Sequence, residues 1–162
     1  MPNRARHPAV PGAAPGRGTR SMTEPTFVDT NVWVYAVDAA DPVKRRRALE
    51  VIAPAPGRDL VVSTQVMTEF YAVITRKLAV PVPVEDADAM VRRLAVLPVV
   101  PLDSSLVIAA IAGSREWQIS IWDALILRAA EVAGCRRLLS EDLADGVRYG
   151  SVVVENPFRM PR

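Results

Sequence analysis

Four acidic residues that lie far apart in the sequence take similar places beside predicted strands and helices. Asp29 ends the apolar run "TFVD", Glu69 lies in the segment after "LVVS", Asp123 begins a late helical segment, and Asp142 follows "RLLS". Carboxylates brought together repel one another and raise each other's pKa. A hard divalent cation with oxygen ligands relieves this repulsion, and two such ions can activate water against a phosphodiester. These residues therefore favour carboxylate chemistry, alone or through metal ions.

The rest of the sequence offers few other catalytic groups. The only histidine, His7, lies in the N-terminal segment, which excludes Ser-His-Asp and Cys-His triads from the folded part. One cysteine, Cys135, cannot build a zinc site with that histidine. Neither Lys44 nor Lys77 lies in a GxxxxGK[ST] motif, and no GxGxxG motif occurs, which disfavours a P-loop and a dinucleotide site.

Short β-branched runs alternate with longer helical patterns along the chain. We predict strands over 26–29, 60–63, 99–103, 137–140 and 151–155, and helices over roughly 31–38, 42–53, 64–79, 84–97, 104–117 and 122–133. Asp41 before Pro42 and Ser104 are predicted to begin helices, and Gly134 to end one. Strands that are apolar throughout and alternate with helices predict a mainly parallel sheet covered on both faces. The carboxyl ends of such strands share one edge, where the four acids are expected to meet.

Each acid also has a simpler structural explanation. Asp29 at a strand-to-helix junction makes a good helix N-cap, and Asn31 is either a turn residue or a group that orients a metal-bound water. Asp123 stabilises a helix dipole in the simpler view, although Ile121 and Trp122 indicate that it emerges from an apolar wall. The structural interpretation would need four independent caps or surface acids at corresponding places in consecutive strand–helix units, which favours a shared site.

Glu69 and Asp142 leave further alternatives open. Helical geometry places Glu69 opposite the apolar stripe of its helix, which favours a solvated helix face, although its place near the first turn keeps it close to the sheet edge. Asp142 could cap a turn, and Glu141 and Asp145 are nearby alternatives at the same corner.

Composition indicates one globular domain with a separate N-terminal extension. Residues 1–22 are rich in Pro, Gly, Ala and Arg and are expected to be disordered, with residues 23–162 as the folded domain. Met22 is an alternative start codon for the protein. The extension holds four arginines and no acid, which leaves 16 Lys and Arg against 18 Asp and Glu in the domain. Without a signal-peptide pattern or a disulfide framework, we expect a cytoplasmic protein that does not cross a membrane.

Basic and aromatic residues suggest contacts but do not define them. The segment "KRRRA" over 44–48 is either a solvated helix face or a contact for RNA phosphates. Trp33, Tyr35 and Trp117 are predicted to be core or interface residues rather than base-stacking platforms.

Four segments in order resemble a known family. "VDTNVWVYA", "STQVMTEFY", "ISIWDALIL" and "LLSEDL" closely resemble the motifs of PIN-domain ribonucleases, especially the VapC-type toxins of bacterial toxin–antitoxin pairs, and "YGSVVVENPF" is typical of one PIN subgroup. The resemblance covers about residues 26–158. It implies a three-layer α/β/α sandwich with a mainly parallel sheet.

The resemblance also assigns roles to particular residues. Asp29, Glu69, Asp123 and Asp142 match the four family carboxylates, with Asp29, Asp123 and Asp142 as metal ligands. Asn31 and Ser140 match supporting polar residues, and Asp145 is a further supporting candidate. The implied activity is Mg²⁺- or Mn²⁺-dependent cleavage of single-stranded RNA that leaves a 5′-phosphate and a 3′-hydroxyl.

Partners follow from the same resemblance. A toxin of this type would form a homodimer, and the C-terminal segment of a cognate antitoxin would lie in a groove beside the active site, supplied by the second to fourth helices. The alternatives are a catalytically silent PIN-like binding or scaffold module and an orphan nuclease without an antitoxin.

Overall fold

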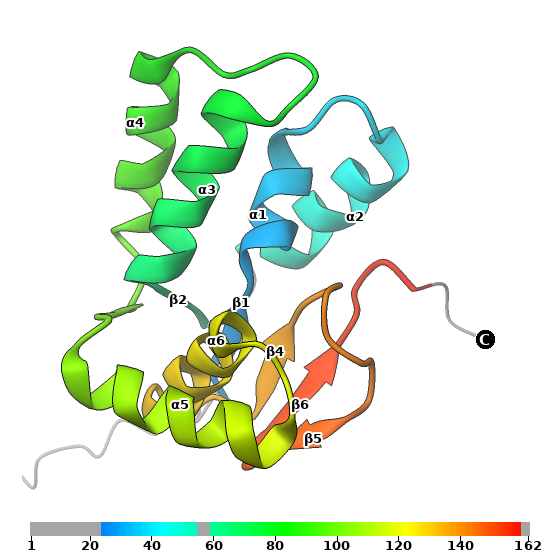
Figure 1. Cartoon of the computed structure of the whole chain (residues 1–162). Helices are drawn as coiled ribbons and strands as arrows, with labels where there is room; N and C mark the ends of the chain where they lie inside the picture. Colours follow the sequence, from blue (N-terminus) through cyan, green and yellow to red (C-terminus); the bar gives the residue numbers. More distant parts are fainter. Residues whose placement is uncertain (1–23, 55–58, 160–162) are drawn as a thin grey trace, which may run out of the picture.

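A twisted sheet runs through the protein, which a computed structural model describes over residues 24–54 and 59–159 (Figure 1). The predicted N-terminal extension lies outside these residues. The strands are β1 Thr26–Val28, β2 Leu60–Ser63, β3 Val99–Val100, β4 Arg137–Leu139, β5 Arg148–Tyr149 and β6 Val152–Glu155. The helices are α1 Thr30–Val37, α2 Pro42–Ile52, α3 Thr64–Arg76, α4 Val84–Leu94, α5 Ser104–Trp117 and α6 Ile121–Val132.

The sheet confirms the predicted parallel arrangement. Its strand order is β3-β2-β1-β4-β6-β5, and every neighbouring pair is parallel except β5 with β6. Strand β5 was not predicted, because a two-residue edge strand that begins with Arg148 and contains no buried residue carries no apolar pattern. The carboxyl ends of β1, β2 and β4 therefore lie side by side at one edge.

Side chains from alternate strand positions pack into two helical layers. Phe27 and Leu138 point into a core formed with α5 and α6, whereas the adjacent residues Val28 and Leu139 point into a second core with α1 and α2. This alternation follows from the strand period of two residues. It confirms the three-layer α/β/α sandwich. Figure 1 shows α3 and α4 as a helical pair that extends beyond the sheet next to α1.

The third core and the aromatic residues fit the predicted pattern. Phe70 and Ile74 of α3 are buried against α4, which accounts for the apolar stripe of α3. Trp33, Tyr35 and Trp117 are partly buried and pack against core clusters, as predicted. In the described ranges, no helix is both long and apolar enough to span a bilayer.

Element ends differ from the predictions where capping groups or prolines decide them. Asp41 caps α2 and Gly134 follows α6 with φ +72°, both as predicted. Asp103, not Ser104, caps α5, because its carboxylate accepts the Leu106 N–H at 2.8 Å.

β3 ends before Pro101, which has no N–H to donate to a ladder. α3 and α4 end three residues earlier than predicted, at Arg76 and Leu94, and each is followed by a proline-containing segment that disfavours helical backbone.

Candidate active site

Asp29 is the only buried acidic residue in the described part of the chain. It follows β1 directly, and its backbone N–H donates to the Leu139 carbonyl of β4 at 3.0 Å. Oδ1 accepts the Thr30 N–H at 2.7 Å and so caps α1. The other oxygen accepts the Ser140 hydroxyl at 2.6 Å, and 7% of the residue is exposed. The same carboxylate is thus a helix cap and part of a polar group at the sheet edge.

The Asn31 amide joins Asp29 to Asp142. Its Nδ2 lies 3.2 Å from Asp29 Oδ2, 3.1 Å from Asp142 Oδ2 and 3.3 Å from Ser140 Oγ. Its Oδ1 accepts the Glu141 N–H at 3.3 Å, which fixes the orientation of the amide. We call the four side chains of Asp29, Asn31, Ser140 and Asp142 the edge cluster. All four were singled out from the sequence.

Burial makes the Asp29 charge unfavourable. Desolvation raises the pKa of Asp29 from 3.8 to about 6; repulsion from Asp142 and Glu69 adds to this, and hydrogen bonds from Ser140 and Thr30 oppose it. Such a carboxylate is costly to ionise in the metal-free protein, whereas a nearby cation favours its charged form. The electrostatics of the edge cluster therefore suit a cation.

The raised pKa of Asp29 predicts how the stability of the metal-free protein depends on pH. An acid whose pKa is raised by folding favours the folded state fully below 3.8, and this contribution is lost as the pH rises through about 6. In EDTA, the unfolding free energy of wild type relative to Asp29→Asn should fall by about 3 kcal/mol across this window, since one pKa unit is worth about 1.4 kcal/mol. Denaturant unfolding of both proteins at a series of pH values measures the difference. A difference that stays constant with pH would contradict the assignment.

Glu69 is half-buried beside the edge cluster rather than on a solvated helix face. Its Oε2 accepts the Thr30 hydroxyl at 3.0 Å, and its Oε1 accepts Gln65 Nε2 at 2.9 Å. The solvated-face interpretation is therefore wrong for this residue. The side of α3 opposite its apolar stripe lines a cleft that it shares with α1, which periodicity alone does not reveal.

Asp123 lies at the start of α6 and is not hydrogen-bonded to the edge cluster. Its Oδ2 accepts the Ser120 hydroxyl at 2.7 Å, and the Asp123 N–H donates to Ser120 Oγ at 3.1 Å. Gln65 links this helix start to the other acids, because its Nε2 also lies 3.3 Å from the Trp122 carbonyl. The apolar wall predicted around Asp123 is one-sided: Ile121 packs against the core, whereas 61% of Trp122 is exposed.

The two alternative acids near Asp142 have other partners. Asp145 accepts the Asn156 N–H at 2.8 Å and lies 3.4 Å from Arg159, so it binds the C-terminal segment rather than the edge cluster. Glu141 forms an ion pair with Lys44, which also donates to the Tyr35 hydroxyl at 2.9 Å. The lysine of the "KRRRA" segment thus joins α2 to Glu141 in the loop after β4.

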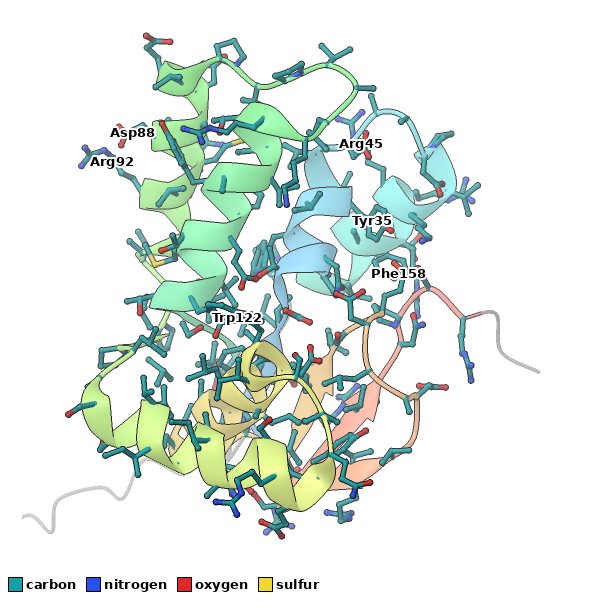
Figure 2. All side chains as sticks on the ribbon, in the orientation of Figure 1. Tyr35, Arg45, Asp88, Arg92, Trp122 and Phe158 are labelled. Atoms are coloured by element: carbon teal, nitrogen blue, oxygen red, sulfur yellow. The ribbon has the colours of Figure 1, made fainter. Side chains whose placement is uncertain are left out.

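A cleft of about 820 Å³ is lined by two of the candidate acids, Glu69 and Asp142, whereas Asp29 and Asp123 are not among its lining residues. The walls come from one face of α1 and one face of α3, and both sets of residues recur every three or four positions. Thr30, Asn31, Glu69 and Asp142 line one end, together with Trp122 from α6. Figure 2 shows Trp122 where the start of α6 meets the first turn of α3.

The donor set suits Mg²⁺ or Mn²⁺. The carboxylates of Asp29 and Asp142 offer the oxygen ligands that these ions prefer, and the Asn31 amide nitrogen lies within hydrogen-bond distance of both. Among residues 24–54 and 59–159, no group of three acidic, histidine or cysteine side chains converges closely enough to enclose an ion. Because Mg²⁺ keeps several waters and takes one or two protein carboxylates, Asp29 and Asp142 fit such an ion without a complete protein cage.

Three side chains that support the acids were not predicted as site residues. Thr30 and Gln65 hold Glu69, and Lys44 holds Glu141 beside Asp142. Gln65 carried a signal, because it lies four residues before Glu69 and so on the same helix face. The Lys44 contact joins distant segments, and no local pattern marks it.

Comparisons with known proteins identify the family and the fold of this chain. A family model of the PIN domain matches residues 26–144. VapC20 of Mycobacterium tuberculosis, a toxin that cleaves the sarcin-ricin loop, has a similar structure, with a TM-score of 0.55 and 19% identity over 72% of this chain and 89% of that one. No curated protein sequence matches this chain.

Two toxin–antitoxin assemblies are also similar. One, from Klebsiella pneumoniae, has a TM-score of 0.58 and 16% identity over 83% of this chain and 99% of that chain. The other is VapBC2 of Rickettsia felis bound to a DNA fragment from its promoter. It has a TM-score of 0.58 and 17% identity over 82% of this chain and 98% of that chain. At these identities the likeness establishes the fold, and the family model covers most of the chain. The protein belongs to the PIN domain family.

Proposed function

We propose that this protein is a metal-dependent endoribonuclease that cleaves single-stranded RNA and acts as the toxin of a toxin–antitoxin pair. The observation that carries the proposal is the edge cluster, in which a buried aspartate with a raised pKa shares one amide with a second aspartate. Family membership and the toxins of similar fold support the same activity.

Asp29 and Asp142 are the proposed ligands of Mg²⁺ or Mn²⁺. When bound there, the ion supplies positive charge that activates water and stabilises the leaving oxygen of a phosphodiester. Ser140 and Asn31 orient the two carboxylates through the hydrogen bonds described above. We assign Asp123 to the same metal site from its motif alone, because the only hydrogen bond that its carboxylate accepts among the described residues comes from Ser120 and does not link it to the edge cluster.

Glu69 is the proposed fourth acid of the site. Thr30 and Gln65 occupy one carboxylate oxygen each, which holds the group at the end of the cleft. From this position Glu69 can orient a water molecule toward a phosphate held beside Asp29. Repulsion from Glu69 also contributes to the raised pKa of Asp29, which supports placing both carboxylates in one site.

We propose an antitoxin and a second copy of the chain as partners. The cleft between α1 and α3 is the groove in which an antitoxin segment would block the acids, supported by its apolar lining of Val34, Ala72 and Val73. We expected the second to fourth helices to supply this groove; in the described residues, α2 and α4 contribute nothing to its lining. The similar assemblies from two bacteria contain toxin and antitoxin together, which supports such a partner.

Metal removal tests the proposed activity. The purified protein should cleave an unstructured RNA with Mg²⁺ or Mn²⁺ and leave 5′-phosphate ends. EDTA should lower the rate by about 100-fold or more, and added Mn²⁺ should restore it. A duplex of the same sequence is the control and should resist cleavage. Cleavage that EDTA does not change would contradict the metal mechanism, and a folded protein inactive with every metal would favour the silent scaffold.

A further inference from the structure

Trp122 is the only exposed aromatic residue of the nine in the chain, all of which are described. The other two tryptophans are partly buried, and Trp117 packs against Tyr149 and Arg128. No aromatic ring or cation among the described residues stacks on the Trp122 indole. Its 61% exposure leaves a broad apolar face uncovered in a protein whose other rings are packed.

The position of Trp122 is fixed relative to the acids. It immediately precedes Asp123, and it lines the cleft together with Glu69, Thr30 and Asp142. The buried Gln65 amide holds the Trp122 carbonyl at 3.3 Å and Glu69 Oε1 at 2.9 Å. One side chain therefore ties the backbone that carries the indole to an acid of the site.

We infer that the Trp122 indole stacks on an unpaired base of the RNA next to the phosphate that is cleaved, an inference that rests on the proposed function. Aromatic side chains bind single strands in this way because every base has a flat π face, and stacking contributes about 1–3 kcal/mol per base. A paired base in a duplex keeps its faces against its neighbours and cannot offer one. Trp122 would thus provide the preference for single strands that the acids alone do not.

Steady-state kinetics with Mn²⁺ and a short single-stranded RNA test this role. Trp122→Ala should raise KM about tenfold and change kcat little, because the lost contact forms on binding. Trp122→Phe keeps a flat ring and should retain most of the affinity. Ile108→Ala removes another exposed apolar side chain, 69% exposed on α5 and outside the cleft, and should behave as wild type.

Tryptophan emission provides a readout that a purely structural role would not change. With Ca²⁺ in place of Mn²⁺, single-stranded RNA should quench the emission of wild type but not that of Trp122→Phe, since Trp33 and Trp117 are packed. Inorganic polyphosphate, which has charge but no bases, should cause no quenching.

Several results would overturn the inference. A wild-type KM for Trp122→Ala, or unchanged emission on RNA binding, would show that no base stacks on the indole and would leave a protein partner as its occupant. Equal losses in Trp122→Ala and Trp122→Phe would indicate a steric role. Failure of wild type itself to bind or cleave RNA would overturn the proposed function as well, and this is seen before any variant is compared.

Discussion

Asp29→Asn should lower the rate of RNA cleavage by about 100-fold or more while the protein stays folded. The change removes one negative charge from the proposed metal site and keeps the size of the side chain, and losses of this order follow when a group that holds or orients a metal is replaced. Folding should survive because burial already disfavours the charged form of Asp29, as its pKa of about 6 indicates. Cleavage rates in Mn²⁺ and thermal unfolding of both proteins measure the two effects.

Asp145→Asn is the matched control for this change. It alters the same chemical group three residues beyond Asp142, but the Asp145 carboxylate binds Asn156 and Arg159 instead of the edge cluster. Its activity should stay within about twofold of wild type. Equal losses in Asp29→Asn and Asp145→Asn would mean that the site extends to the C-terminal segment or that Asp29 has no special role.

The sheet edge could be predicted from the sequence because each part of the prediction is local. Apolar runs followed by helical patterns give parallel strands, and parallel strands place their following residues at one edge. Asp29 and Ser140 follow β1 and β4, which are neighbours in the sheet, so their contact is a direct consequence of strand order. Family resemblance supplied the roles, which spacing does not.

The remaining contacts depend on packing between distant segments. Glu69 faces the site rather than solvent because α1 packs beside α3 and Thr30 of α1 donates to its carboxylate. The residue pattern of α3 alone does not indicate this neighbour. The pairing of Lys44 with Glu141 likewise needs α2 to lie against the loop after β4. Asp123 shows the converse: its motif predicts a site residue, whereas its contacts are those of a helix cap with Ser120.

The second large effect concerns the metal itself. Asp29 and Asp142 share the Asn31 amide, and repulsion between the two acids contributes to the raised pKa of Asp29. A divalent ion held by both carboxylates would relieve that repulsion, so the free energy of binding would depend on both. Loss of either should weaken Mn²⁺ binding by about 10- to 100-fold. This measurement needs no RNA, so its outcome does not depend on the identity of the substrate.

Calorimetric titration of Mn²⁺ into the purified protein at neutral pH tests the central claim most directly. Wild type and Asp145→Asn should bind with the same affinity, and Asp29→Asn and Asp142→Asn should each bind about 10- to 100-fold more weakly. Equal affinity in all four proteins, or no binding by wild type, would show that these carboxylates do not hold a divalent ion.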